Sequence, residues 1–131
     1  MDFVQIGLWI VQGLVGLAFL GAGFMKLTQP EEKLIDNGMT FIEDIGINAT
    51  RGIGLLEVLG GLGILLPVPL NILPVLTPLA ALGLMIVMVG ALLTHLRRGE
   101  TSSVVPNVVL GALVTIVFFA YNTHLGELLG L

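Results

Sequence analysis

Four long apolar stretches dominate this 131-residue sequence. They cover about residues 3–26, 49–66, 75–96 and 104–121. Each approaches the roughly 17–25 residues that a helix needs to cross the hydrocarbon core of a membrane. The sequence therefore predicts an all-α, polytopic membrane protein in which four transmembrane helices form an antiparallel bundle.

The composition indicates lipid as the surrounding medium. The chain is 56% hydrophobic and only 11% charged, whereas about a quarter of the residues of a soluble domain are charged. Too few charged residues remain to cover a water-soluble core, so we expect residues 1–131 to form a single domain within the lipid bilayer. The first stretch is too long for a signal-peptide core and has no basic residue before it, so we expect it to be retained.

The distribution of basic residues predicts an orientation. All five lie in or beside the connections 28–50 and 97–103; they are Lys26, Lys33, Arg51, Arg97 and Arg98. Cytoplasmic loops retain Lys and Arg. We therefore predict a multi-pass protein of the cell membrane with these two loops in the cytoplasm and both the N- and C-termini outside. The formal net charge of −4 argues against nucleic-acid binding, which needs clustered cations.

The 28–50 connection has the pattern of a short interfacial helix. Thr28 and Glu31 have the spacing of a capping box, Pro30 suits a first helical turn, and Gly38 suits a helix end. Two interpretations remain open. The segment is either a connector that rests at the membrane interface or a lid over polar residues of the bundle.

One acidic residue lies inside an apolar stretch. Glu57 follows Arg51 by six residues, which places it about 9 Å deeper along a helix. A carboxylate in hydrocarbon costs on the order of 3 kcal/mol or more, so it should pair with a cation or take up a proton. Lys26 is the first candidate partner, and Arg51 and Arg97 are alternatives. His95 approaches from the same side and could exchange a hydrogen bond with the carboxylate.

These residues define a predicted intramembrane polar cluster. It comprises Lys26, Glu57, His95 and Arg51, with Gln12, Thr94 and Arg97 in supporting positions. Gln12, Phe19 and Lys26 recur every seven residues and so share a helix face that should turn inward. Glu57 and Lys26 could instead form a structural pair that fixes helix register. One Glu and one His fall short of the three or four ligands of a typical metal site, so no metal is predicted.

Several segments together resemble the DoxX-like family of small four-helix membrane proteins. They are residues 19–27, 51–61, 76–78, 90–91 and 94–100. The resemblance extends from about residue 7 to residue 121. It implies an association with membrane oxidoreductase systems, including the small subunits of thiosulfate:quinone oxidoreductases, while more distant relatives resemble assembly factors. Lys26, Glu57 and His95 match recurring polar positions of the family, which supplies no catalytic residue set to carry over.

Three functions remain open at this level. The first is an accessory subunit of a quinone-linked oxidoreductase, with a soluble or membrane oxidoreductase as partner and quinone as cofactor. The second is a non-catalytic scaffold or assembly factor, and the third is a small-solute or proton conduit. The sequence has no cysteine, so a partner would have to supply any thiol chemistry. Its glycine-rich helix faces are compatible with a homo-oligomer.

Overall fold

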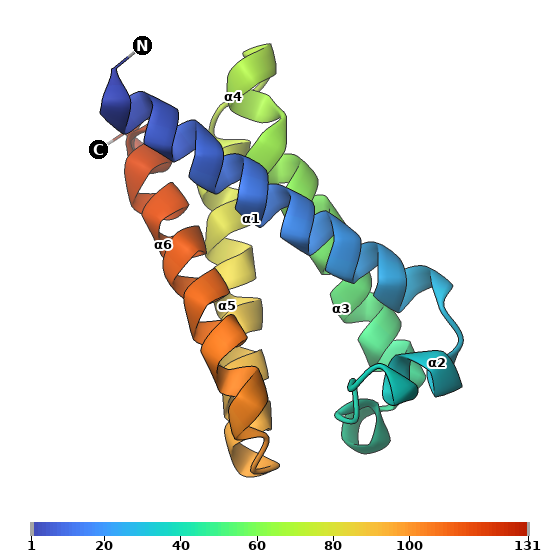
Figure 1. Cartoon of the computed structure of the whole chain (residues 1–131). Helices are drawn as coiled ribbons and strands as arrows, with labels where there is room; N and C mark the ends of the chain where they lie inside the picture. Colours follow the sequence, from blue (N-terminus) through green and yellow to red (C-terminus); the bar gives the residue numbers. More distant parts are fainter. Residues whose placement is uncertain (1, 131) are drawn as a thin grey trace.

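The structure is a computed structural model that describes residues 2–130, and all regular secondary structure in this range is helical. The elements are α1 (Phe3–Thr28), α2 (Glu31–Asp36), α3 (Ile42–Leu65), α4 (Pro67–Leu70), α5 (Leu76–Arg97) and α6 (Thr101–Leu129) (Figure 1). The all-α prediction is confirmed.

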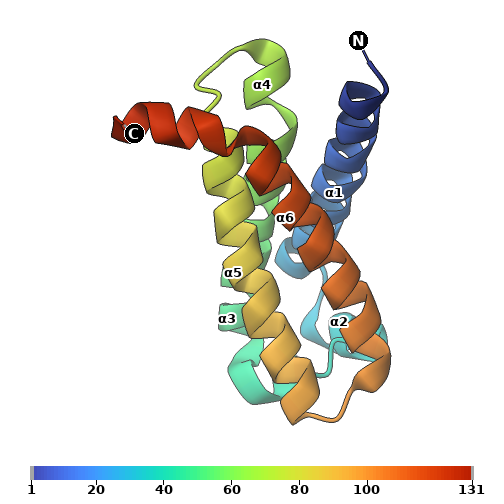
Figure 2. The same ribbon diagram turned by 90° about the vertical axis from the view of Figure 1, so that its left-hand side faces the viewer.

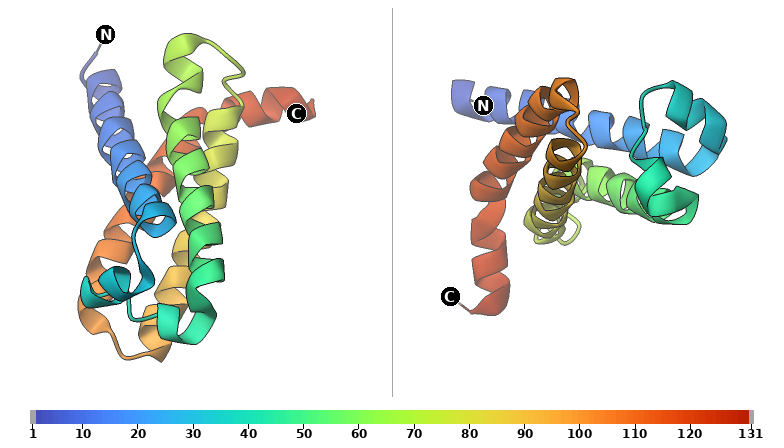
Figure 3. Two further views of the ribbon diagram at one scale, coloured as in Figure 1. Left: turned by 90° about the vertical axis from the view of Figure 1, so that its right-hand side faces the viewer. Right: turned by 90° about the horizontal axis from the view of Figure 1, so that it is seen from below.

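The long helices are arranged as two pairs. Helix α1 packs along α3, α5 packs along α6, and α3 joins the pairs by packing against α5. The pairs meet near α4 and diverge toward α2, as Figure 1 and the view from below in Figure 3 show. Both described ends of the chain lie at the α4 end, while α2 and the α5–α6 turn lie at the other (Figure 1). The C-terminal part of α6 bends away from the other helices (Figure 2).

Two predicted helix boundaries need correction. Helix α3 begins at Ile42, before the expected start at residue 49, and includes a kink at Gly46 with φ of 84°. This left-handed backbone conformation is readily adopted by glycine because it has no Cβ. Helix α6 covers Thr101–Leu129, and therefore extends beyond the predicted 104–121 at both ends.

The predicted capping box in the first connection is wrong. Pro30 is the N-cap residue of α2, and within residues 2–130 no side chain caps the start of this helix. The Thr28 hydroxyl instead donates a hydrogen bond to the Phe24 carbonyl at 2.8 Å. The predicted helix end is present, because Gly38 follows α2 with φ of 102°.

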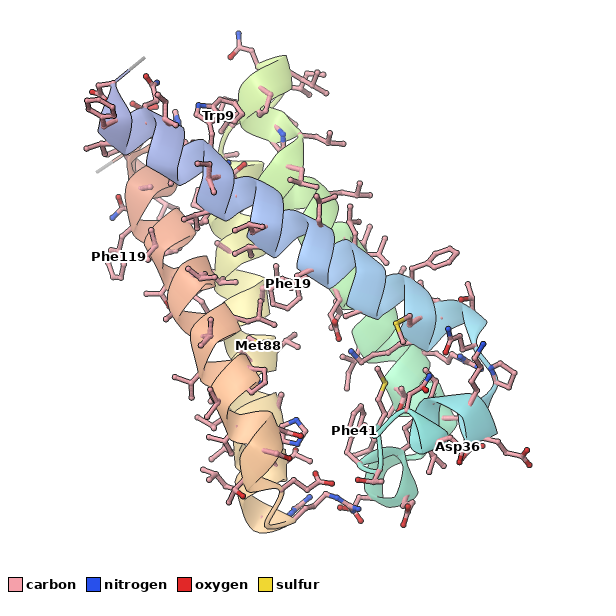
Figure 4. All side chains as sticks on the ribbon, in the orientation of Figure 1. Trp9, Phe19, Asp36, Phe41, Met88 and Phe119 are labelled. Atoms are coloured by element: carbon pink, nitrogen blue, oxygen red, sulfur yellow. The ribbon has the colours of Figure 1, made fainter. Side chains whose placement is uncertain are left out.

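In the described part of the chain, three helical segments are long and apolar enough to cross a membrane: Phe3–Thr28, Leu76–Arg97 and Thr101–His124. Helix α3 is not among them, because polar residues that include Arg51 and Glu57 interrupt its apolar sequence. Large apolar side chains are exposed along the outer faces; Phe119, for example, points away from the other helices (Figure 4). These features are those of a multi-pass membrane protein.

The buried core lies where the two helix pairs meet. It consists of Val15, Phe19, Ile64, Ala81, Leu84, Val114, Val117 and Tyr121. The predicted inward face of α1 is buried at Gln12, Phe19 and Lys26. Because this core occupies the α4 end of the bundle, the diverging helices at the α2 end leave space between them.

Candidate functional site

A cavity of about 550 Å³ lies between the two helix pairs. It is called the central cavity below. Figure 4 shows the side chains of Phe19, Met88 and Phe41 around this space. Most of the lining is apolar, and its polar side chains are Lys26, Glu57, Thr94, His95, Ser102, Ser103 and Asn107. The cavity therefore combines apolar walls with a small number of hydrogen-bonding groups.

An ion pair between α1 and α3 forms part of the cavity wall. Lys26 Nζ lies 2.7 Å from Glu57 Oε1, and the two residues are 9% and 2% exposed. Close contact between the helices makes this pairing possible, since a Cβ added at Gly54 would lie 2.7 Å from the Lys26 Cβ. Lys26, the first candidate partner from the sequence, is therefore the residue that pairs with Glu57.

Arg51 was an alternative candidate partner of Glu57, but its hydrogen bonds go to the backbone at the end of α1. Its Nη1 donates hydrogen bonds of 2.6 Å to the carbonyl oxygens of Lys26 and Gln29. These carbonyls belong to the C-terminal end of α1, where a positive charge interacts favourably with the helix dipole. The Arg51 guanidinium thus holds the end of α1 against α3.

His95 belongs to a polar network at the base of the cavity. Its Nδ1 lies 3.1 Å from Glu100 Oε1, and the Thr40 hydroxyl donates a hydrogen bond to the same carboxylate. Arg98 Nη1 lies 2.7 Å from Asp44 Oδ2. The hydrogen bond from Thr40, followed by that from His95, lowers the pKa of Glu100. We call these five residues the interloop network, because they join residues 40–44, around the start of α3, to residues 95–100, around the α5–α6 turn.

Part of the 28–50 connection, for which a lid and an interfacial connector were both open, lies at the central cavity. Phe41 and Ile45 line the central cavity, and Thr40 and Asp44 belong to the interloop network. This part of the 28–50 connection therefore contributes to the wall of the cavity, and its role as a lid stays a prediction.

The remaining predicted site residues lie apart from the ion pair. Gln12 Nε2 donates to the Ile64 carbonyl at 3.1 Å, and the Tyr121 hydroxyl donates to Gln12 Oε1 at 2.7 Å. Thr94 lines the cavity but donates its hydroxyl hydrogen bond to Gly90 in its own helix. Arg97 is exposed. One cluster containing all seven residues is therefore not confirmed.

Asn107 is a cavity residue that the sequence analysis did not include in the site. It is 8% exposed, and its Nδ2 donates to the Met88 sulfur at 3.5 Å. An amide inside an apolar helix is costly unless it is hydrogen-bonded, which is the sequence signal that could have identified it. Within the described residues, no three His, Asp or Glu side chains are grouped to hold a metal ion.

Comparison with known proteins places these residues in a family. No curated protein and no solved structure matches the chain. The model of the DoxX-like family matches residues 10–117, a range that contains every residue lining the central cavity. The chain therefore belongs to the DoxX-like family.

Proposed function

We propose that this chain is an accessory subunit of a quinone-linked membrane oxidoreductase system and that its central cavity binds the quinone ring. The observation that carries the proposal is a buried ion pair in the wall of an otherwise mostly apolar cavity. Small-molecule sites are commonly cavities of about 300–1,000 Å³ with apolar walls and a few polar groups. At about 550 Å³, the central cavity lies within this range.

The ion pair presents hydrogen-bond donors and acceptors side by side. Among the described residues, Glu57 takes one of the three N–H groups of Lys26, and a carboxylate has further acceptor capacity. An oxidised quinone has carbonyl acceptors, and its reduced form has hydroxyl donors. The pair therefore offers complementary groups to both forms. Its charges cancel, which favours a neutral ring over an anion.

The redox chemistry in this proposal belongs to a partner. The chain has no cysteine with which to form a dithiol centre, so its role is to hold and orient the ring while a membrane or soluble oxidoreductase exchanges electrons with it. The association of named members of the DoxX-like family with quinone-linked enzymes supports this assignment. A scaffold role predicts instead that partner assembly depends on the chain without any bound quinone.

Quinone binding is testable by filling the cavity. Gly90 lines it, and no heavy atom lies within 4 Å of the position that a Cβ would take. We expect Gly90→Leu to fold and to reduce the quinone recovered with the purified protein by about tenfold, because the new side chain occupies ligand space. Mass spectrometry of lipid extracts, after mild-detergent purification at native expression, measures the quinone-to-protein ratio.

Gly21→Leu is the matched control, since Gly21 also has open space around it and does not line the cavity. This variant should retain the wild-type amount of quinone. Wild-type protein that contains no quinone under these conditions, while still assembling with a partner, would contradict the proposal and favour the scaffold function.

We also propose that α3 completes an antiparallel bundle of four spans. Its outer face exposes Leu55, Leu56 and Leu59, as expected of a helix in contact with lipid. The five basic residues lie in the last turn of α1, in α2, in the first half of α3 and at the α5–α6 turn, and Figure 1 shows α2 and the α5–α6 turn at the same end of the bundle. The bias of Lys and Arg toward cytoplasmic loops then places this end in the cytoplasm and the termini outside.

Single cysteines test this topology, because the natural chain has none. Asn37 and Ile72 are both exposed and lie on opposite sides of α3 in the sequence. We expect a membrane-impermeant maleimide to label Ile72→Cys in intact cells and to label Asn37→Cys only after permeabilisation. Equal labelling of both variants in intact cells would contradict the proposal that α3 spans the membrane.

A further inference from the structure

A second hollow runs along the outer side of α3 and α5. It has a volume of about 750 Å³ and extends to α4, and the described residues that line it have apolar side chains or are glycines. Figure 3 shows α3 and α5 side by side below α4. We call this hollow the outer groove. Among the residues that the structure describes, none with a polar side chain lines the groove to receive a quinone ring or a charged headgroup.

The outer groove adjoins the central cavity. Val87 lines both spaces. On α5, Gly83 lines the groove and Gly90 lines the cavity, and spacings of four and three residues place both on the same helix face as Val87. On α3, Leu56 of the groove directly precedes Glu57 of the cavity. The two spaces therefore follow one another along α5 and meet at Val87, whereas on α3 they lie on different faces, because consecutive residues of a helix point in different directions.

The dimensions of the groove suit an extended hydrocarbon chain. Its lining runs along α3 from Leu56 to Leu66, the C-cap residue of this helix, which corresponds to about 15 Å along a helix axis. It begins level with the ion pair and leads toward the α4 end of the bundle. Small residues form part of its lining, including Gly60, Gly63 and Gly83.

We infer that the outer groove binds the hydrocarbon tail of the ligand whose ring occupies the central cavity. The ligand is accordingly a lipid-soluble quinone with a long apolar tail. This inference rests on the proposed quinone function. Free lipid chains compete for the same groove, but a tail attached to a bound ring has a high effective concentration there. Covalent attachment therefore favours the ligand tail over bulk lipid.

Photo-crosslinking locates the tail directly. The full chain is placed in lipid nanodiscs with a long-tailed benzoquinone that carries a diazirine at the tail end, and crosslinked residues are identified by mass spectrometry. Excess short-chain benzoquinone serves as competitor, because it displaces the ring but cannot fill the groove. We expect crosslinks at groove residues such as Leu62 and Leu79, and we expect the competitor to remove them.

Gly83→Leu blocks the groove in a second arm of the experiment. Among the described residues, no heavy atom lies within 4 Å of the position that a Cβ would take at Gly83, and we expect the rest of the leucine side chain to extend into the groove that Gly83 lines. We expect this variant to bind the long-tailed probe about fivefold more weakly because the tail loses van der Waals contacts. Binding of short-chain benzoquinone should not change. Gly21→Leu should bind both probes as the wild type does.

The outcomes distinguish a failure of the tail site in the outer groove from a failure of quinone binding in the central cavity. Competitor-sensitive crosslinks at the groove, lost in Gly83→Leu, support the tail site. Competitor-sensitive crosslinks confined to other helix faces overturn the tail site and leave quinone binding intact. Crosslinks that the competitor never reduces, together with no binding of the short-chain probe, overturn both proposals. Unchanged binding of the long-tailed probe by Gly83→Leu also overturns the tail site.

Discussion

Replacing Lys26 with methionine is expected to lower the free energy of unfolding by about 3–5 kcal/mol, the cost of leaving a buried charge without its partner. Glu57 is 2% exposed, and Lys26 donates a 2.7 Å hydrogen bond to it. Methionine preserves the length of the side chain but removes the ammonium. Denaturation of the purified protein in mild detergent, followed by circular dichroism, measures the loss.

A double variant distinguishes the effect of the unpaired charge from that of altered packing. Lys26→Met combined with Glu57→Leu removes both charges, and its stability should return to within about 1 kcal/mol of the wild type, because apolar replacement of a whole buried pair is often neutral. Equal destabilisation of the single and double variants would show that packing causes the loss. The folded double variant should still fail to retain quinone, because the proposed hydrogen-bonding groups are absent.

The second large effect concerns the contact between α1 and α3. A Cβ at Gly23 would lie 2.5 Å from the carbonyl oxygen of Gly54 and 2.8 Å from the backbone nitrogen of Val58. Backbone atoms cannot rotate out of the way, so Gly23→Ala must push the helices apart. We expect a loss of about 3 kcal/mol, at the upper end of the usual cost of overpacking. Weaker Lys26–Glu57 pairing should accompany it.

Gly21→Ala is the control on the same helix. No heavy atom lies within 4 Å of its expected Cβ, and alanine favours a helix over glycine by about 0.5–1 kcal/mol. This variant should therefore be as stable as the wild type or slightly more stable. The same denaturation measurement serves both variants. Equal stability of Gly23→Ala and Gly21→Ala would contradict the close helix contact.

The same contact changes the interpretation of the glycine-rich faces. In the sequence these faces are compatible with a homo-oligomer, yet Gly16, Gly23, Gly54 and Gly61 all lie where a Cβ would overlap atoms of the neighbouring helix in the same chain. Glycine allows helices to approach closely in lipid but does not specify whether the partner helix is in the same molecule. Sequence alone could not make that distinction.

The candidate site was predictable only in part. A carboxylate in an apolar helix needs compensation, and helical periodicity placed Lys26 on the inward face of α1, so their pairing followed from local rules. Local rules did not predict that Arg51 and His95 would bind partners other than Glu57. Arg51 contacts the carbonyls that end α1, and His95 contacts Glu100. These partners become neighbours only after the helices and loops are packed.

The sequence by itself determined the helices, the apolar surfaces that identify a membrane protein, and the concentration of basic residues at one end. These properties depend on hydrophobicity and on the period of a helix, which act along the chain. Only the tertiary structure decided that the two helix pairs diverge around a cavity and that an apolar groove adjoins it. Such spaces depend on crossing angles and on contacts between distant residues, including the backbone approach at Gly23 and Gly54.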